Sequence, residues 1–197
     1  MQVLGGYERG LAFVLSGPSG AGKTTLVDML CKEFDCIERS ISFTTRAPRA
    51  SEREGIDYNF ITKEEFEEKI EKGDFLEYAK VFDHYYGTSK SFVEAQKDKG
   101  KHVILVIDTQ GAMQLMGSYD ASFVFVSPPS IEILRMRMLL RNSETETTIE
   151  QRLSWAKKEM ELSFRYDYLV LNQDLKDAYQ VLKSILIAEE HKIRNCS

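Results

Sequence analysis

The sequence predicts an α/β fold in which a parallel sheet is flanked by helices. Two observations support this. Short apolar runs alternate with longer stretches that have helical spacing, and a glycine-rich loop separates the first apolar run from the first helical stretch. Strands that alternate with helices are typical of βαβ units and a parallel sheet.

Four apolar runs are expected to form strands of this sheet. They are Leu11–Ser16, His102–Asp108, Ser122–Ser127 and Tyr168–Leu171. The stretch Lys23–Phe34 places Leu26, Met29 and Leu30 on one face, so we expect a helix there. The first strand, the loop and this helix would then form one continuous unit.

Two stretches differ from this core. Residues from Ser42 to about Phe92 are rich in polar and aromatic side chains, which indicates an inserted lobe of short strands and one helix, Lys63–Lys72. Arg141–Thr148 is polar and has no apolar anchor before Ile149. Its composition is typical of a mobile flap.

Size and charge narrow the classes of function. A chain of 197 residues with 43% hydrophobic residues suffices for one compact core with small lobes. The net charge of −5 argues against non-specific binding to nucleic acid. Cys31, Cys36 and Cys196 match no metal or redox spacing. No apolar run approaches the roughly 18 residues that cross a membrane, and the start of the chain lacks a signal-peptide core. We therefore expect a cytoplasmic protein with reduced thiols and neither nucleic acid nor membrane as a partner.

The loop Gly17–Thr24 (GPSGAGKT) matches the pattern G-x-x-x-x-G-K-[ST] of a P-loop. Its three glycines let backbone N–H groups turn inward, and the helix that follows offers its positive end to phosphate. Lys23 can reach the β- and γ-phosphates, and Thr24 can offer a hydroxyl to Mg²⁺. The alternative is a glycine-rich turn that caps an ordinary helix. The motif predicts a nucleoside triphosphate site but does not identify the group that receives the phosphate.

Asp108 closes the second predicted strand. A carboxylate at the carboxyl end of a parallel strand faces the region where such sheets bind ligands. It could hold metal-bound water or orient an acceptor, or it could simply begin a turn. Both interpretations stay open here.

Basic and phenolic side chains suggest sites for phosphate groups. In the lobe, Arg46 and Arg49 stand three apart beside a proline, and tyrosines follow in DYNF and YYGT. Arginine forks and hydroxyls suit a dianionic monophosphate. The alternative is surface charge above a small aromatic core. Near the flap, Arg137 and Arg141 are four apart and Arg152 lies beyond. They could stabilise a transferring phosphoryl group, or line a solvated helix face.

Several segments together resemble the guanylate kinase family. They are GPSGAGKTT, SFTTRAPRASEREGIDYNF, GDFLEYAKVFDHYYGTS, IDTQGA, VSPPS and RNSETETTIEQRL. They occur in order from roughly Leu11 to Tyr179. In combination they are far more specific than the P-loop alone.

The resemblance implies a nucleotide-binding core (1–41, 93–140 and 156–197), a GMP-binding lobe (42–92) and a mobile lid (141–155). It also implies transfer of the γ-phosphate of ATP to GMP, with Mg²⁺, and with dGMP as a further candidate substrate. GMP would be held by Ser42, Arg46, Arg49, Tyr58, Glu77, Tyr86, Thr88 and Asp108. ATP would be held by Gly17, Pro18, Ser19, Gly20, Ala21, Gly22, Lys23, Thr24, Thr25 and, near the adenine, Asn172. Lys23, Arg137, Arg141 and Arg152 would act in catalysis, and Thr24 on the metal.

Glu77 has a chemical rationale of its own. Guanine presents N1–H and N2–H₂ donors on one edge, and an ionised carboxylate accepts both. Taken alone, however, Glu77 in GDFLEYA would be expected to be a solvated strand residue.

The chain also departs from the family pattern. Val106 replaces a carboxylate that is common two residues before the aspartate of the D-x-Q-G stretch, Asn142 replaces a glycine in the flap, and Ala50-Ser51 replaces a stretch with a glycine.

Two rival functions are a binding module that has lost catalysis and a kinase for another acceptor. The intact P-loop and the guanine-reading set argue against them.

Overall fold

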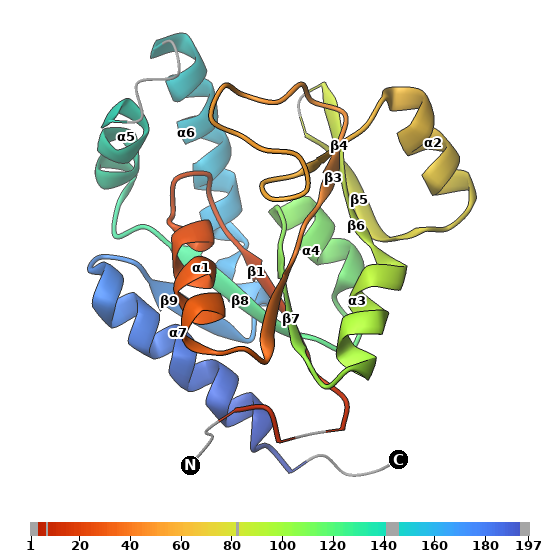
Figure 1. Ribbon diagram of the computed structural model, residues 1–197. Helices are drawn as coiled ribbons and strands as arrows, with labels where there is room; N and C mark the ends of the chain where they lie inside the picture. The colour runs from red at the N-terminus through yellow and green to blue at the C-terminus, as the bar shows by residue number, and fades with distance from the viewer. Residues whose placement is uncertain (1–3, 7, 82, 141–145, 194–197) are drawn as a thin grey trace.

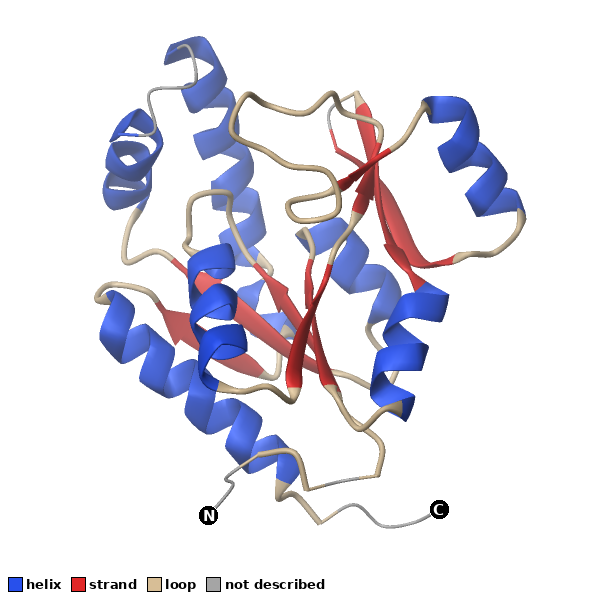
Figure 2. Ribbon diagram, in the orientation of Figure 1, coloured by secondary structure: helices blue, strands red, loops and turns tan. Residues whose placement is uncertain are grey.

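The computed structural model describes residues 4–6, 8–81, 83–140 and 146–193. Its centre is a parallel sheet with the strand order β2-β7-β1-β8-β9. The strands are β1 (Ala12–Ser16), β2 (Ile37–Ser40), β7 (His102–Val106), β8 (Ser122–Ser127) and β9 (Tyr168–Leu171). Figure 2 shows this sheet between its helices. The predicted fold class is confirmed. The edge strand β2 (IERS) escaped the prediction because it contains a single apolar residue.

Helices cover both faces of the parallel sheet because its strands are apolar on both sides. On one face, α1 (Lys23–Glu33) and α7 (Leu175–Glu190) share a buried cluster with Phe13 and Leu15 of β1. On the other, α3 (Lys90–Asp98) and α4 (Thr109–Leu115) share a cluster with Ala12 and Val14. Successive β1 residues thus alternate between two cores, as the period of a strand requires.

The second sheet has the order β4-β3-β6-β5 and forms the inserted lobe. Its strands are β3 (Phe43–Thr44), β4 (Asn59–Phe60), β5 (Phe75–Val81) and β6 (His84–Ser89), and α2 (Lys63–Glu71) accompanies them. The α2 helix begins with a capping box between Thr62 and Glu65. Its Phe66 ring stacks on Phe75 and Tyr85, at 4.5 and 5.2 Å between centroids. A small aromatic core therefore holds the lobe together.

A third unit consists of α5 (Ile131–Leu140) and α6 (Glu146–Glu161). It is followed by a short 3₁₀ turn, Ser163–Arg165, before β9. The two helices share a separate buried cluster of Leu134, Met138, Ile149, Leu153 and Ala156. Residues 146–148 of the predicted flap belong to α6, so the helix begins earlier than the sequence indicated. The rest of that stretch, 141–145, lies outside the described residues.

Figure 1 shows how these units surround the P-loop end of the parallel sheet. The α5–α6 pair stands on one side and the second sheet with α2 on the other, while the turn from β1 into α1 lies between them. Among the described residues, no helix is long and apolar enough to cross a membrane.

Candidate active site

The P-loop joins the end of β1 to the start of α1. Gly17, Gly20 and Gly22 have φ angles of 134°, 90° and 94°, in the region that favours glycine. A Cβ on Gly17 would also lie 2.2 Å from the Val126 carbonyl oxygen. Gly22 is the N-cap of α1 and provides no side-chain cap, so the first N–H groups of the helix are available to an anion. Larger residues could not adopt this backbone without strain.

Lys23 lies over this loop. Its Nζ donates to the carbonyl oxygens of Gly17, at 2.5 Å, and Pro18, at 3.0 Å. The ammonium group is therefore already at the phosphate-binding turn. Thr24 and Thr25 are exposed in the first turn of α1, where a hydroxyl can meet a ligand from outside.

Asn172 follows β9 and packs behind the loop. Its Nδ2 donates to the Ala21 carbonyl oxygen at 2.7 Å, and the residue is 3% exposed. Its own carbonyl oxygen accepts from Arg137 Nη2 at 2.8 Å. The predicted ATP residue Asn172 thus contacts the loop directly.

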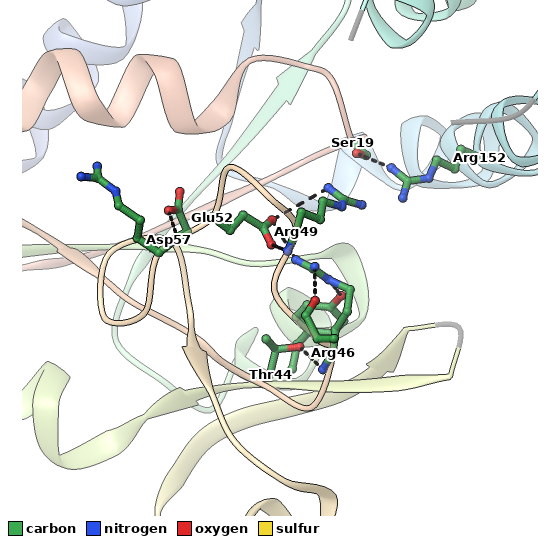
Figure 3. Close-up of polar contacts among 10 residues, drawn as sticks. Ser19, Thr44, Arg46, Arg49, Glu52, Asp57 and Arg152 are labelled. Carbon is green, nitrogen blue, oxygen red and sulfur yellow. Dashed lines mark hydrogen bonds and ion pairs between the residues drawn. The ribbon is translucent and has the colours of Figure 1, made fainter. Parts of the chain in front are cut away.

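Two predicted catalytic arginines extend from the α5–α6 pair to the nucleotide-binding region. Arg137 of α5 reaches Asn172, and Arg152 of α6 donates to Ser19 Oγ at 3.3 Å (Figure 3). The third, Arg141, lies outside the described residues. The solvated-face interpretation is thereby overturned for Arg137 and Arg152, since both side chains contact residues of the predicted ATP site.

The lobe brings four predicted GMP-phosphate residues to one place. Arg46 Nε donates to the Tyr86 hydroxyl at 3.3 Å, and its guanidinium lies 5.4 Å from the centre of the Tyr58 ring. Arg46 is largely buried, with a side chain 15% exposed, whereas Arg49 is half exposed. The interpretation of Arg46 as a surface charge is therefore wrong.

Glu52 joins these arginines, although sequence reasoning did not select it. Its Oε1 accepts from Arg46 Nη2 at 2.9 Å, and its Oε2 accepts from the Arg49 backbone N–H at 2.9 Å, as Figure 3 shows. Burial raises the pKa of Glu52, but the hydrogen bonds from Arg46 and from the Arg49 backbone, together with the charges of both arginines, outweigh this and hold the pKa below its usual value. The only sequence signal was its position three residues after Arg49.

The predicted guanine-reading residues lie where β5 and β6 meet. Glu77 pairs with Thr88 across these strands, and the Thr88 hydroxyl donates to Glu77 Oε1 at 2.6 Å. Glu77 is 4% exposed, so the expectation of a solvated strand residue is wrong. Ser42 is also buried, just before β3. Burial raises the pKa of Glu77 to about 7, and the Asp108 charge adds to the rise.

Gly111 explains how Glu77 is accommodated against α4. A Cβ on Gly111 would lie 2.2 Å from Glu77 Oε2, so only glycine leaves room for the carboxylate. Asp108 caps the same helix, accepting from the Gly111 N–H at 2.8 Å. The structure thus bears out the turn interpretation of Asp108. It also corrects the predicted strand, which ends at Val106 rather than Asp108 because Asp108 is the N-cap of α4.

Two carboxyl groups, the buried Glu159 and the half-buried Asp108, lie near Lys23. Burial raises the pKa of both, and the Lys23 charge opposes the rise. Glu159 accepts from the Thr109 hydroxyl at 3.4 Å. Sequence reasoning missed Glu159 because it stands in KKEME of α6, a stretch that looks like a solvated helix face. Val106, which replaces the family's common carboxylate, packs instead against the α1–α7 core.

Comparison with known proteins identifies the family of this chain. The family model described as guanylate kinase matches residues 9–189. A guanylate kinase of Protochlamydia amoebophila is 54% identical over 97% of this chain and 98% of its own length. One of Clostridioides difficile is 46% identical over 94% of this chain and 91% of its own. The crystal structure of guanylate kinase from Anaplasma phagocytophilum, at 35% identity, covers 93% of this chain and 88% of its own, with a TM-score of 0.78. This chain belongs to the guanylate kinase family.

Proposed function

We propose that this chain transfers the γ-phosphate of ATP to GMP and releases ADP and GDP. The observation that carries the proposal is the buried carboxylate of Glu77, held by Thr88 and bordered by Gly111. Family membership supports the same activity. In this proposal, residues of the lobe bind the base and phosphate of GMP, residues of the P-loop bind ATP, and arginines of the helical pair and lid stabilise the phosphoryl group during transfer.

Guanine is recognised by Glu77 with Ser42 and Thr88. The ionised carboxylate accepts from N1–H and the N2 amino group, while Thr88 keeps one carboxylate oxygen oriented. Adenine has an acceptor at N1, so it would leave the buried carboxylate facing a lone pair. Such a mismatch can discriminate between substrates by several powers of ten.

The GMP phosphate is held by Arg46, Arg49, Tyr58 and Tyr86. Arg46 is preorganised, because Glu52, Tyr86 and the Ala47 carbonyl oxygen each accept one of its N–H groups. A guanidinium has five N–H donors, so two remain for phosphate oxygens. The GMP phosphate, a dianion, would therefore bind to an Arg46 guanidinium whose orientation is already fixed.

ATP is held by residues 17–25 and Asn172, and Lys23, Arg137, Arg141 and Arg152 stabilise the transferring phosphoryl group. The exposed Thr24 hydroxyl beside the loop is a hard oxygen donor and suits Mg²⁺. Burial raises the pKa of Asp108 and the Lys23 charge opposes this rise, so the Asp108 carboxylate is proposed to bind water around such an ion. When bound, Mg²⁺ would neutralise charge on the β- and γ-phosphate oxygens.

Catalysis also needs closure of the lobe (42–92) and the lid (141–155) over the substrates. Closure aligns a GMP phosphate oxygen for in-line attack on the γ-phosphorus and excludes water that would otherwise hydrolyse ATP. Because α5 and α6 share one buried cluster, we expect α5 to move together with α6 during closure. A cytoplasmic location, acceptance of dGMP and the absence of a nucleic-acid partner stay predictions.

A coupled assay of ADP formation tests the proposal. ATP with Mg²⁺ is supplied together with GMP, AMP, UMP or no acceptor. We expect turnover with GMP only. In Glu77→Gln, we expect kcat/KM for GMP to fall at least about a hundredfold, because an amide donor now faces a guanine donor. Glu71→Gln, at an exposed position of α2, is the matched control and should behave as the wild type.

Two results would refute the assignment. Nucleotide binding without turnover on any acceptor would indicate a binding module. Turnover with AMP or UMP that is unaffected by Glu77→Gln would indicate another acceptor and a different base-reading residue.

A further inference from the structure

Asn172 is held by three hydrogen bonds at the carboxyl end of β9. Its backbone N–H donates to the Ser127 carbonyl oxygen at 2.8 Å, and its carbonyl oxygen accepts from Arg137 at 2.8 Å. Its side-chain Nδ2 donates to the Ala21 carbonyl oxygen at 2.7 Å. Only 3% of the residue is exposed. Its side chain therefore contacts protein atoms almost entirely, and little of its surface is accessible to the adenine base of ATP.

The loop backbone fits closely around this side chain. A Cβ on Gly22 would lie 2.3 Å from Asn172 Nδ2, so the amide packs directly on the Ala21–Gly22 peptide. Ala21 is fully buried, and its own N–H donates to the Pro18 carbonyl oxygen at 3.1 Å. The peptide is thus held by the turn on one side and by Asn172 on the other.

The hydrogen bond from Asn172 to the Ala21 carbonyl oxygen also fixes the direction of the Gly22 N–H, because both groups belong to one planar peptide. In a trans peptide the C=O and the following N–H point in opposite directions. Because Asn172 holds the Ala21 carbonyl from behind the loop, the Gly22 N–H is directed away from Asn172. Backbone N–H groups that point into the interior of a P-loop bind phosphate oxygens, and the Gly22 N–H would be one of them.

We propose that Asn172 is a positioning residue that orients the Ala21–Gly22 peptide of the P-loop toward the triphosphate, and that it acts without reading the adenine. This inference rests on the proposed function, because it requires the loop to bind the donor's phosphates. The family resemblance led us to expect Asn172 near the adenine of ATP, whereas this inference assigns it no contact with the base. Asn172 also accepts a hydrogen bond from Arg137, so the same residue supports both the P-loop and a proposed catalytic arginine.

An experiment can distinguish a residue that positions the P-loop from one that contacts the adenine, because only the second effect depends on which base the phosphate donor carries. The experiment measures kcat/KM with ATP and with UTP as donors at saturating GMP, and calorimetric affinity for inorganic tripolyphosphate with Mg²⁺. Asn172→Ala removes the side-chain bond. Gln173→Ala, at the exposed neighbouring position, is the matched control. Asn172→Ser, a smaller change, serves if the alanine variant fails to fold.

We expect Asn172→Ala to lower kcat/KM by about tenfold with both donors, the usual effect of losing one such hydrogen bond. Tripolyphosphate affinity should fall by a similar factor, and the KM for GMP should stay within about twofold. A loss confined to ATP would overturn the proposal in favour of an adenine contact. Unchanged constants with both donors would overturn it as well. If the wild type shows no GMP-dependent turnover, the proposed function fails instead.

Discussion

In the proposed function, Glu77 is a single residue that gives up stability for recognition. The carboxyl group is buried with one hydrogen bond from Thr88 and near the charge of Asp108. Its ionised form is therefore disfavoured in the free protein and favoured when guanine donors arrive. The burial that weakens the unliganded fold is thus the same burial on which the proposed selectivity for guanine depends, a combination found at many functional sites.

Glu77→Gln should accordingly stabilise the unliganded protein at high pH. The folded pKa of about 7 exceeds the ordinary value of 4.5, so stability falls as pH rises between these values and stays low above 7. At pH 8 we expect the variant to gain about 2–3 kcal/mol in the free energy of unfolding, and at pH 4 almost nothing. Urea denaturation at both pH values measures this. An equal gain at the two values would exclude ionisation as the cause.

Gly111→Ala tests the space beside the same carboxylate. Alanine should favour the helix by up to about 1 kcal/mol, but its Cβ would lie 2.2 Å from Glu77 Oε2 and displace it. We expect the KM for GMP to rise at least about tenfold, while the KM for ATP changes little. Steady-state kinetics with each substrate varied provides the measurement. An unchanged KM for GMP would mean that Glu77 does not depend on this glycine.

At the scale of elements, the α5–α6 pair has its own apolar core. Leu134 and Met138 of α5 pack with residues of α6, and Arg135 bridges the helices through Glu146 and Glu150 at 2.6 and 3.1 Å. Exposed ion pairs of this kind contribute little, so the apolar contacts hold the pair together. The helices can therefore move as one body that carries Arg137 and Arg152.

Leu153→Ala should loosen this body without unfolding the sheet. Removing a buried leucine costs about 2–5 kcal/mol where the side chain packs. We expect faster amide hydrogen exchange in α5 and α6, unchanged exchange in β1 and β8, and a lower kcat with little change in the KM for GMP. Leu140→Ala, at a position 83% exposed, is the control. Equally accelerated exchange in the parallel sheet would show that the pair is not an independent unit.

At the scale of the whole molecule, two units flank the P-loop end of the parallel sheet, and each carries arginines of the proposed site. The lobe supplies Arg46 and Arg49, and the helical pair supplies Arg137 and Arg152. The donor and acceptor phosphates would bring these like charges together. Substrate binding then provides the differential interaction energy that a closed state requires.

We expect closure to need both nucleotides. Small-angle scattering should show a smaller radius of gyration with GMP and a non-hydrolysable ATP analogue together than with either alone. In Glu77→Gln, GMP should lose its contribution, whereas the analogue alone should act as in the wild type. Full compaction with the ATP analogue alone would refute a closure that depends on the acceptor.

The parallel α/β core, the P-loop and the helix that follows it could be predicted from the amino-acid sequence alone. These features depend on local periodicity and on glycines at positions with positive φ, and both are encoded by residues close together in the chain. Other features became visible only in the folded chain. Glu77 and Glu159 look like solvated residues in the chain, and Glu52 looks like one more charge in a loop. Distant elements remove Glu77 and Glu159 from water: β6 and α4 surround Glu77, and the first turn of α4 lies beside Glu159. Glu52 is instead held by Arg46, six residues away, through the fold of one loop. Because these contacts form only in the folded chain, the pKa values and partners of the three carboxyl groups could not be predicted from local sequence patterns.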